Sequence, residues 1–157
     1  MAVGAPKRPR EHRVAYRRIV VPLALDDDSD VSISLAAELA AEARASITAV
    51  VVIEVPAELP LAAHMKDEEA AAGTALERAR AISAGYGVRL RARVIRSRAR
   101  GEAIVTEADA VGADLIVVRA PRTGRLGGHA PLFGKTVDYV LRHASCRVLV
   151  AAPQPDR

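Results

Sequence analysis

Short apolar runs rich in Val and Ile alternate along the chain with Ala-rich segments whose apolar positions recur at helical spacing. Such runs are typical of buried strands, and the helical spacing predicts amphipathic helices. Between residues 31 and 45, Leu35 and Leu39 lie one turn apart, and Ser29 or Asp30 precedes them as a helix cap. The pattern predicts strands at 19–23, 47–55, 88–95, 114–118 and 147–151, and helices at 31–45, 66–85, 101–111 and 134–143.

Strands that are separated by helices need crossover connections, so the expected fold class is α/β, a doubly wound, five-stranded parallel sheet with helices on both faces. The third strand carries Arg89, Arg91 and Arg93 at alternate positions, which is typical of an edge strand. With that edge fixed, we expect the strand order 3-2-1-4-5, with the last strand, Arg147 to Ala151, at the other edge. This second edge is apolar and lacks charged protection, which predicts a homodimer formed through the last strands.

Length and charge indicate one domain with a basic N-terminal arm. The 157 residues suit a single domain. Residues 1–18 hold six Lys/Arg and one acid, whereas residues 19–157 hold 17 Lys/Arg and 18 acids, so the net charge of +4 comes from the N-terminal end. We expect residues 1–17 to be a disordered arm and residues 18–153 to form the domain.

Other features narrow the classes of function. The single cysteine, Cys146, cannot form an intrachain disulfide, and no CxxC or HExxH spacing predicts a bound metal. No apolar run approaches the roughly 18 residues of a membrane helix, so we expect no membrane span and a cytoplasmic location. Aromatic residues, on which single-stranded nucleic acids stack, make up only 3% of the chain. The arginines from Arg89 to Arg100 are therefore attributed to edge protection and a solvated loop, without specific nucleic-acid binding, and nonspecific binding with the arm is the alternative.

In sheets of this kind, ligands bind at the carboxyl ends of the strands near the switch in strand order, here between the first and fourth strands. Residues 24–30 follow the first strand, and residues 119–133 follow the fourth in a loop too long to be only a connection. This second loop is rich in Arg and Gly and leads into a helix at Gly134, whose N-terminal amides attract anions. We expect it to hold a phosphate, and the alternative is a mobile basic surface loop. No nucleophile and base can be paired from the sequence, so no catalytic residue is assigned and no enzyme is expected.

Three stretches of sequence carry a resemblance to a known family. They are Ile19-Val20-Val21-Pro22, the segment Gly112-Ala113-Asp114-Leu115-Ile116-Val117-Val118, and Gly134 through Tyr139-Val140-Leu141-Arg142-His143-Ala144-Ser145-Cys146-Arg147-Val148-Leu149-Val150. With the order of strands and helices, they resemble the universal stress protein (Usp) family over about residues 18–152. The resemblance implies the sheet order given above, dimerisation through the last strand and, in many members, binding of ATP or AMP.

The family's nucleotide motif follows the fourth strand and reads Gly-x2-Gly-x9-Gly-Ser/Thr, and this chain keeps it only in part. Counted back from Gly134, Gly124 matches the second glycine, but Pro121 stands at the first. Counted forward from the strand, Arg119 and Arg122 take the two glycine positions. A side chain at these positions blocks the close approach of the backbone to phosphate.

The positions around this motif depart from the family as well. Lys135 follows Gly134 where the family has Ser or Thr, although Thr136 comes next. The family's Val-Pro-x-Asp motif reads Val21-Pro22-Leu23-Ala24 here, and Asp26 could take the place of the missing aspartate. The resemblance also implies that the backbone of Val52 contacts adenine, and the alternative is that Val52 belongs only to the core. The expected nucleotide-binding residues are therefore Pro22, Leu23, Ala24, Asp26, Val52, Arg119, Arg122, Gly124, Gly134, Lys135 and Thr136.

Two functions remain in competition. The first is a stress or regulatory protein that binds ATP or AMP through an altered loop, with weak ATP hydrolysis left open. Asp26, Asp27, Asp28 and Asp30 would then form an acidic rim that repels a triphosphate unless Mg²⁺ or the arginines neutralise it. The second is a dimeric interaction module that binds no nucleotide and regulates an unknown partner, such as a transporter, through the apolar connector Leu59, Leu61 and Met65.

Overall fold

The structure is a computed structural model that describes residues 15–25, 29–121 and 133–152. Its strands are β1 (Arg18–Leu23), β2 (Ser46–Glu54), β3 (Leu90–Ser97), β4 (Leu115–Arg119) and β5 (Arg147–Ala151), and its helices are α1 (Asp30–Ala43), α2 (Lys66–Gly85), α3 (Arg100–Val111) and α4 (Gly134–His143). Each predicted strand and helix is present, with bounds that differ by at most two residues.

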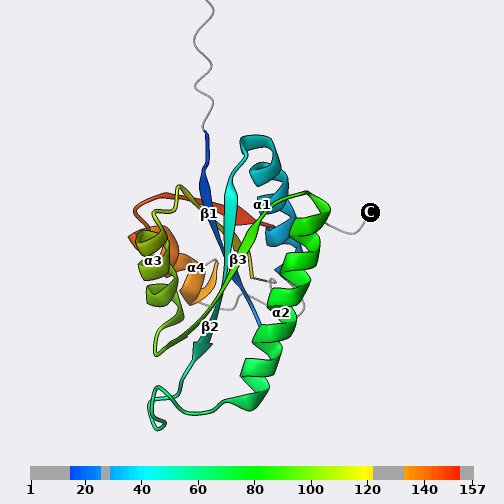
Figure 1. Cartoon of the computed structure of the whole chain (residues 1–157). Helices are drawn as coiled ribbons and strands as arrows, with labels where there is room; N and C mark the ends of the chain where they lie inside the picture. Colours follow the sequence, from blue (N-terminus) through cyan, green and yellow to red (C-terminus); the bar gives the residue numbers. More distant parts are fainter. Residues whose placement is uncertain (1–14, 26–28, 122–132, 153–157) are drawn as a thin grey trace, which may run out of the picture.

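The five strands form one parallel sheet in the order β3-β2-β1-β4-β5, which confirms the predicted fold class and order. Figure 1 shows α1 and α2 on one side of the sheet and α3 and α4 on the other. Because every strand runs in the same direction, all carboxyl ends meet at one edge and all amino ends at the opposite edge. The N-termini of all four helices therefore lie toward the carboxyl edge.

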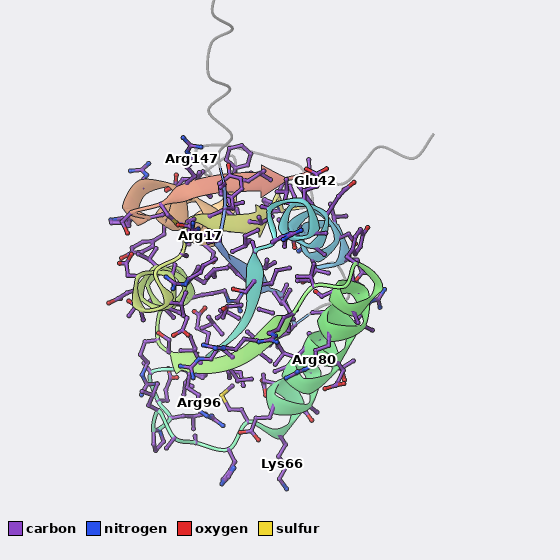
Figure 2. The ribbon with its side chains drawn as sticks, turned by 45° about the horizontal axis from the view of Figure 1, so that its top comes forward. Arg17, Glu42, Lys66, Arg80, Arg96 and Arg147 are labelled. Atoms are coloured by element: carbon purple, nitrogen blue, oxygen red, sulfur yellow. The ribbon has the colours of Figure 1, made fainter. Side chains whose placement is uncertain are left out.

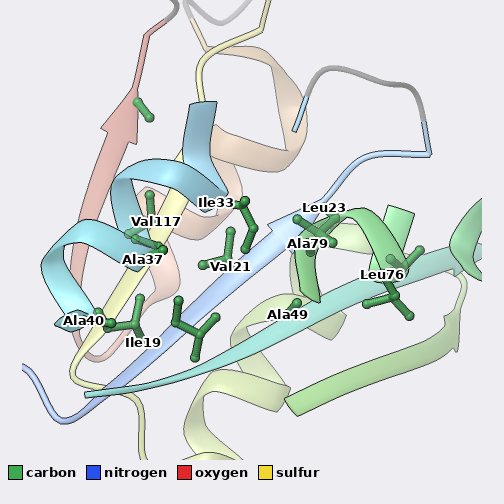
Figure 3. Close-up of a cluster of buried hydrophobic side chains, with 14 of the residues drawn as sticks. Ile19, Val21, Leu23, Ile33, Ala37, Ala40, Ala49, Leu76, Ala79 and Val117 are labelled. Atoms are coloured by element: carbon green, nitrogen blue, oxygen red, sulfur yellow. The ribbon is translucent and has the colours of Figure 1, made fainter. Parts of the chain in front are cut away.

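Each face of the sheet has its own apolar core, because successive strand residues point to opposite faces. On the α1/α2 face, Ile19 and Val21 of β1 pack with Ala37 of α1 and Leu76 of α2 (Figure 3). On the α3/α4 face, Val20 lies in a second cluster, whose buried members also include Val50, Val52, Ala103, Ile104, Ala108, Ile116, Val118, Val137 and Val140. The interior strands are buried on both faces, as their unbroken apolar sequences predict.

The start and end of α1 differ from the expectation. Leu35 and Leu39 are only partly buried, and small residues such as Ala36 and Ala40 form the side that packs against the sheet. Arg44 adopts a left-handed conformation (φ 54°) that ends the helix, so Ala45 is not part of it. Ser29 occupies the N-cap position, but its side chain makes no capping hydrogen bond.

The two edge strands differ as predicted, since Arg91 and Arg93 of β3 and Arg89 just before it are exposed, whereas Val148 to Val150 of β5 are apolar and half-buried. Of the predicted N-terminal arm, residues 1–14 lie outside the described part. Arg17, which the prediction placed at the end of the arm, donates its backbone N–H to Oδ2 of Asp114 (2.8 Å). Within the described residues, no helix is long and apolar enough to cross a membrane.

Candidate functional site

The candidate site is a cavity at the carboxyl edge of the sheet, between β1 and β4, where the strand order reverses direction. The end of β1 and the turn after it form one wall, and the end of β4 with the first turns of α3 and α4 forms the other. The cavity has a volume of about 220 Å³. Its described lining residues are Pro22, Leu23, Ala24, Ser29, Arg100, Ile104, Val118, Arg119, Pro121, Phe133, Gly134, Lys135, Thr136 and Val137. We refer to it as the carboxyl-edge cavity.

Hydrogen bonds hold the turn after β1 in place. Ser29 Oγ accepts a hydrogen bond from the backbone N–H of Ala24 (2.9 Å), and the carbonyl oxygen of Ser29 accepts one from Ser32 Oγ (3.0 Å). The Ser29 hydroxyl is therefore used across the turn and not to cap α1. Its own proton remains a hydrogen-bond donor at the wall of the cavity.

The first turn of α4 forms the opposite wall. Gly134 begins the helix with φ +76°, a conformation that strongly favours glycine. A Cβ at this position would meet Pro121 Cγ at 3.8 Å, an ordinary contact, so the constraint on Gly134 is its backbone conformation. Phe133 at the N-cap gives no side-chain cap, and the first-turn N–H groups thus create a local positive potential beside Lys135 and Thr136.

Three cationic side chains from different elements line the carboxyl-edge cavity: Arg100 from α3, Arg119 from β4 and Lys135 from α4. The described lining residues include no Asp or Glu. Arg100 has a distant carboxylate partner, since its Nε lies 3.9 Å from Oε2 of Glu54. The described walls of the cavity are therefore electropositive, which suits an anionic ligand.

The α3 and α4 walls are fixed relative to each other by a close helix contact. A Cβ placed on Gly101 would lie 2.8 Å from Tyr139 Cβ, too close for any side chain to be accommodated without a shift. Gly101 is buried and directly follows Arg100, while Tyr139 lies within α4. The position of Lys135 relative to Arg100 thus depends on the absence of a side chain at Gly101.

The structure brings together most of the predicted site residues. Those that line the carboxyl-edge cavity are Pro22, Leu23, Ala24, Arg119, Gly134, Lys135 and Thr136. Val52 is 3% exposed and lies in the core of the α3/α4 face, outside the lining. Asp26, Arg122 and Gly124 fall outside the described residues, so their predicted roles stay predictions.

One expectation about charge is corrected. Asp30 does not belong to an acidic rim of this cavity, because its carboxylate pairs with Arg78 of α2 on the other face of the sheet. There it lines a separate pocket of about 200 Å³ between α1 and α2, together with Thr74 and Ile82. Asp26, Asp27 and Asp28, the rest of the predicted rim, lie outside the described residues.

Sequence reasoning missed Arg100, Ser29 and Phe133 as lining residues. A signal for Arg100 was available, because it begins a helix that follows a strand, and this places it at the carboxyl edge by topology alone. Ser29 belongs to the loop of residues 24–30 that the sequence places at the site, but its individual predicted role was that of a helix cap. Phe133 precedes the helix at the end of a long loop, where the sequence pattern fixes no position.

The described residues provide neither a metal centre nor a reactive thiol. In the ranges that the structure describes, no group of three or more His, Cys, Asp or Glu side chains is arranged to hold a metal ion. Burial raises the pKa of the Cys146 thiol, and the nearby carboxylate of Asp109 adds to this effect. The thiol is therefore protonated at neutral pH and is a poor nucleophile.

Comparisons with known proteins agree with this architecture. The model of the universal stress protein family matches residues 15–152. A universal stress protein solved in complex with cAMP is 25% identical, with a TM-score of 0.67 over 87% of this chain and 97% of that one. A universal stress protein from Lactobacillus plantarum is 26% identical, with a TM-score of 0.67 over the same shares of the two chains. One from Archaeoglobus fulgidus, solved with dAMP, is 20% identical, with a TM-score of 0.69 over 87% and 98%, and shows the fold alone. A search of curated protein sequences gives no significant match.

Proposed function

The chain belongs to the universal stress protein family, and from this membership we propose that its carboxyl-edge cavity binds an adenine nucleotide, ATP or AMP. The observation that carries the proposal is that Arg100, Arg119 and Lys135 line the same cavity as the uncapped start of α4. This arrangement fits a phosphate group, because guanidinium and ammonium groups and helix N-terminal amides all favour an anion. The complex of a related family member with cAMP supports the assignment.

Each residue has a distinct role in this proposal. Lys135 and the N–H groups of the first turn of α4 contact the phosphate, with the Thr136 hydroxyl as a further donor. Arg100 and Arg119 supply further charge from the ends of α3 and β4, in place of the close backbone approach that the altered glycine motif does not allow. Ala24 provides no carboxylate for the sugar, so we expect weaker recognition of ribose than of phosphate.

We further propose that binding needs no Mg²⁺ and is not followed by hydrolysis. The three cations already balance phosphate charge, and no described lining residue is a carboxylate or histidine that would bind the ion or activate water. ATP titrations in Mg²⁺ and in EDTA are expected to give affinities within about two-fold of each other. A loss of binding in EDTA would contradict this part of the proposal.

Isothermal titration with AMP and ATP tests the nucleotide site. Replacing the lysine by glutamine (Lys135→Gln) removes one charge-assisted contact, so the dissociation constant is expected to rise about ten-fold, corresponding to about 1.4 kcal/mol. Lys66→Gln is the matched control, since Lys66 is exposed at the start of another helix, α2 (Figure 2). No heat at millimolar nucleotide, or equal losses in both variants, would overturn the proposal.

The connector between β2 and α2 favours a second candidate function, a surface for a partner protein. Arg98 donates from Nη1 to the carbonyl oxygens of Val55 (3.0 Å) and Pro56, and from Nη2 to that of Leu59 (2.7 Å). This clamp holds the connector in one shape while Leu59 and Leu61 remain 42% and 47% exposed. A fixed, exposed apolar projection suits protein contact.

Nucleotide titration separates the two candidates. If the partner surface is the main function, the protein binds no nucleotide. The native protein should then elute from its cell extract as a specific complex in size exclusion, and the double variant Leu59→Ser with Leu61→Ser should lose this complex. A nucleotide that copurifies with the protein would count against this second candidate.

We also propose a homodimer through β5 and a cytoplasmic location. β5 has one neighbour in the sheet, β4, and its Val148, Leu149 and Val150 are half-buried and apolar, so pairing with a second copy would cover them. A single protonated cysteine suits a reducing compartment. Light scattering at micromolar concentration is expected to give the mass of a dimer, and a monomer mass would refute it.

A further inference from the structure

A second basic cleft lies at the amino ends of β1, β2 and β3, at the end of the sheet opposite the carboxyl-edge cavity. It has a volume of about 610 Å³ and is lined by Arg18, Ser46, Ile47, Thr48, Arg89, Arg91, Asp109, Ala110, Val111 and Gly112. None of these residues lines the carboxyl-edge cavity. We refer to it as the arginine cleft.

Strand register explains why its polar groups meet. Arg18 of β1 lies beside Ser46 of β2, and two residues further along β2, Thr48 lies beside Arg91 of β3. These side chains share the α3/α4 face, because Val50, two residues after Thr48, belongs to the core of that face. Farther along the strands α3 covers this face, but α3 ends at Val111 and leaves the amino ends of β2 and β3 open.

The cleft carries more positive than negative charge. Arg89 and Arg91 are exposed, and within the described part of the chain neither has a carboxylate within 4.0 Å, whereas Arg93 on the same face of β3 pairs with Glu107 at 2.9 Å. Asp109 is the acidic lining residue among those described, and its Oδ1 accepts a hydrogen bond from the Ser145 hydroxyl outside the lining.

Arg18 completes the basic wall. Its guanidinium Nη1 lies 3.1 Å from the position that a Cβ on Gly112 would occupy, so the side chain extends across the C-terminus of α3. Part of its charge is balanced by Asp114, because Arg18 helps to lower the pKa of that carboxyl. The described lining still combines three guanidinium groups with the Thr48 hydroxyl, the Ser46 hydroxyl, which donates to the carbonyl oxygen of Arg17 (3.4 Å), and one carboxylate.

Edge protection accounts for Arg89 and Arg91 but not for the rest of the cleft. Charged residues on β3 discourage pairing of this edge with another sheet. Arg18, however, belongs to β1, which is the middle strand and has no free edge. Arg18 of the middle strand and the hydroxyl groups of β2 line the same cleft as Arg89 and Arg91. Protection of the β3 edge does not require these additional groups.

We propose that the arginine cleft binds a small molecule that carries more than one phosphate group. Guanidinium groups bind phosphate through paired N–H donors, and the Thr48 hydroxyl adds a single donor. Arg18 and Arg91 come from strands two positions apart and are offset by two residues along them, so their backbone positions lie about 12 Å apart, and several linked phosphates fit them better than one phosphate does. The volume lies in the range of small-molecule sites, and the lining residues that the structure describes include no aromatic side chain to stack nucleic-acid bases.

Titration of the full chain with tripolyphosphate and with pyrophosphate tests the proposal. Arg89→Gln combined with Arg91→Gln is expected to raise the tripolyphosphate dissociation constant at least about ten-fold, a loss of about 1.4 kcal/mol. Arg80→Gln, on the exposed side of α2 (Figure 2), is the control for general charge and should change it less than about two-fold. The titrations are made with AMP saturating the carboxyl-edge cavity, and the Arg89/Arg91 double variant should bind AMP within about two-fold of the unchanged chain, so this site and the nucleotide site can fail independently.

Three results would overturn the proposal. The first is the absence of binding at millimolar tripolyphosphate. The second is an equal loss in the Arg80→Gln control, or no loss in the Arg89/Arg91 double variant. The third is binding of a 20-base-pair DNA duplex that the double variant loses and tripolyphosphate does not displace, which would assign the cleft to nucleic acid.

Discussion

Replacing Gly101 by alanine is the sharpest test of how α3 and α4 are held together. The added Cβ would lie 2.8 Å from Tyr139 Cβ and 2.9 Å from Cγ and Cδ1. Tyr139 Cβ is attached directly to the α4 backbone, so a change of rotamer does not relieve the contact. The helix itself must move away from α3.

The expected cost follows from two opposing effects. Overpacking of this kind costs about 1–3 kcal/mol. Alanine is a better helix former than glycine by at most about 1 kcal/mol, and Gly101 is the second residue of α3, where the gain is smaller. We expect Gly101→Ala to lower the free energy of unfolding by about 1–2 kcal/mol.

Gly73→Ala in α2 provides the matched control, because a Cβ at Gly73 meets no atom within 4 Å. This variant is expected to be more stable than the unchanged chain by about 0.5–1 kcal/mol. With a urea m-value of about 2 kcal/mol/M, the midpoints of the two variants should differ by about 1 M. If Gly101→Ala unfolds at the same urea concentration as Gly73→Ala, the close contact between α3 and α4 is refuted.

Two further predictions concern other hydrogen-bonded contacts. The backbone N–H groups of Arg17 (2.8 Å) and Arg18 (2.9 Å) donate to Oδ2 of Asp114 and lower the pKa of this carboxyl. The Asp114 carboxylate therefore stabilises the fold at pH values above its pKa in the unfolded chain. This contribution is lost as the pH falls through the lower pKa of the folded state. Asp114→Ala should reduce the free energy of unfolding by about 1 kcal/mol at pH 7, with the difference shrinking in acid, and a pH-independent difference in urea unfolding would contradict this role. Arg98→Ala removes the clamp on the connector, so amide hydrogen exchange at residues 56–65 should accelerate while the urea midpoint changes little; unchanged exchange would show that Arg98 does not hold the connector.

The fold was predictable because local pattern and topology agree along the whole chain. Continuous apolar runs, the helices between them and the alternating arginines in and just before β3 were enough to predict the strand order. The end of α1 was harder to predict, because Arg44 ends the helix with a positive φ and the sequence has no glycine there to indicate it. The small residues that pack α1 on the sheet were also overlooked in favour of the larger Leu35 and Leu39.

The candidate site was predictable where it depends on position along a strand or at a helix start, as for Leu23, Ala24 and Gly134. It was not predictable where a contact joins distant parts of the chain. Asp30 was expected beside the nucleotide, but Arg78 lies 48 residues away in sequence and takes its carboxylate to the other face. The acidic run at residues 26–30 does not by itself indicate that Arg78 of α2 pairs with Asp30.

α3 spans the two proposed binding sites, with Arg100 in the wall of the carboxyl-edge cavity and Gly112, its C-cap, in that of the arginine cleft. Its 12 residues extend about 18 Å, more than two Debye lengths at physiological ionic strength. Direct Coulomb forces between ligands at the two ends are therefore screened, and two rigid sites would fill independently. Cooperativity between a nucleotide and a polyphosphate would instead report an axial displacement of α3, with the tight crossing at Gly101 and Tyr139 carrying the movement to α4.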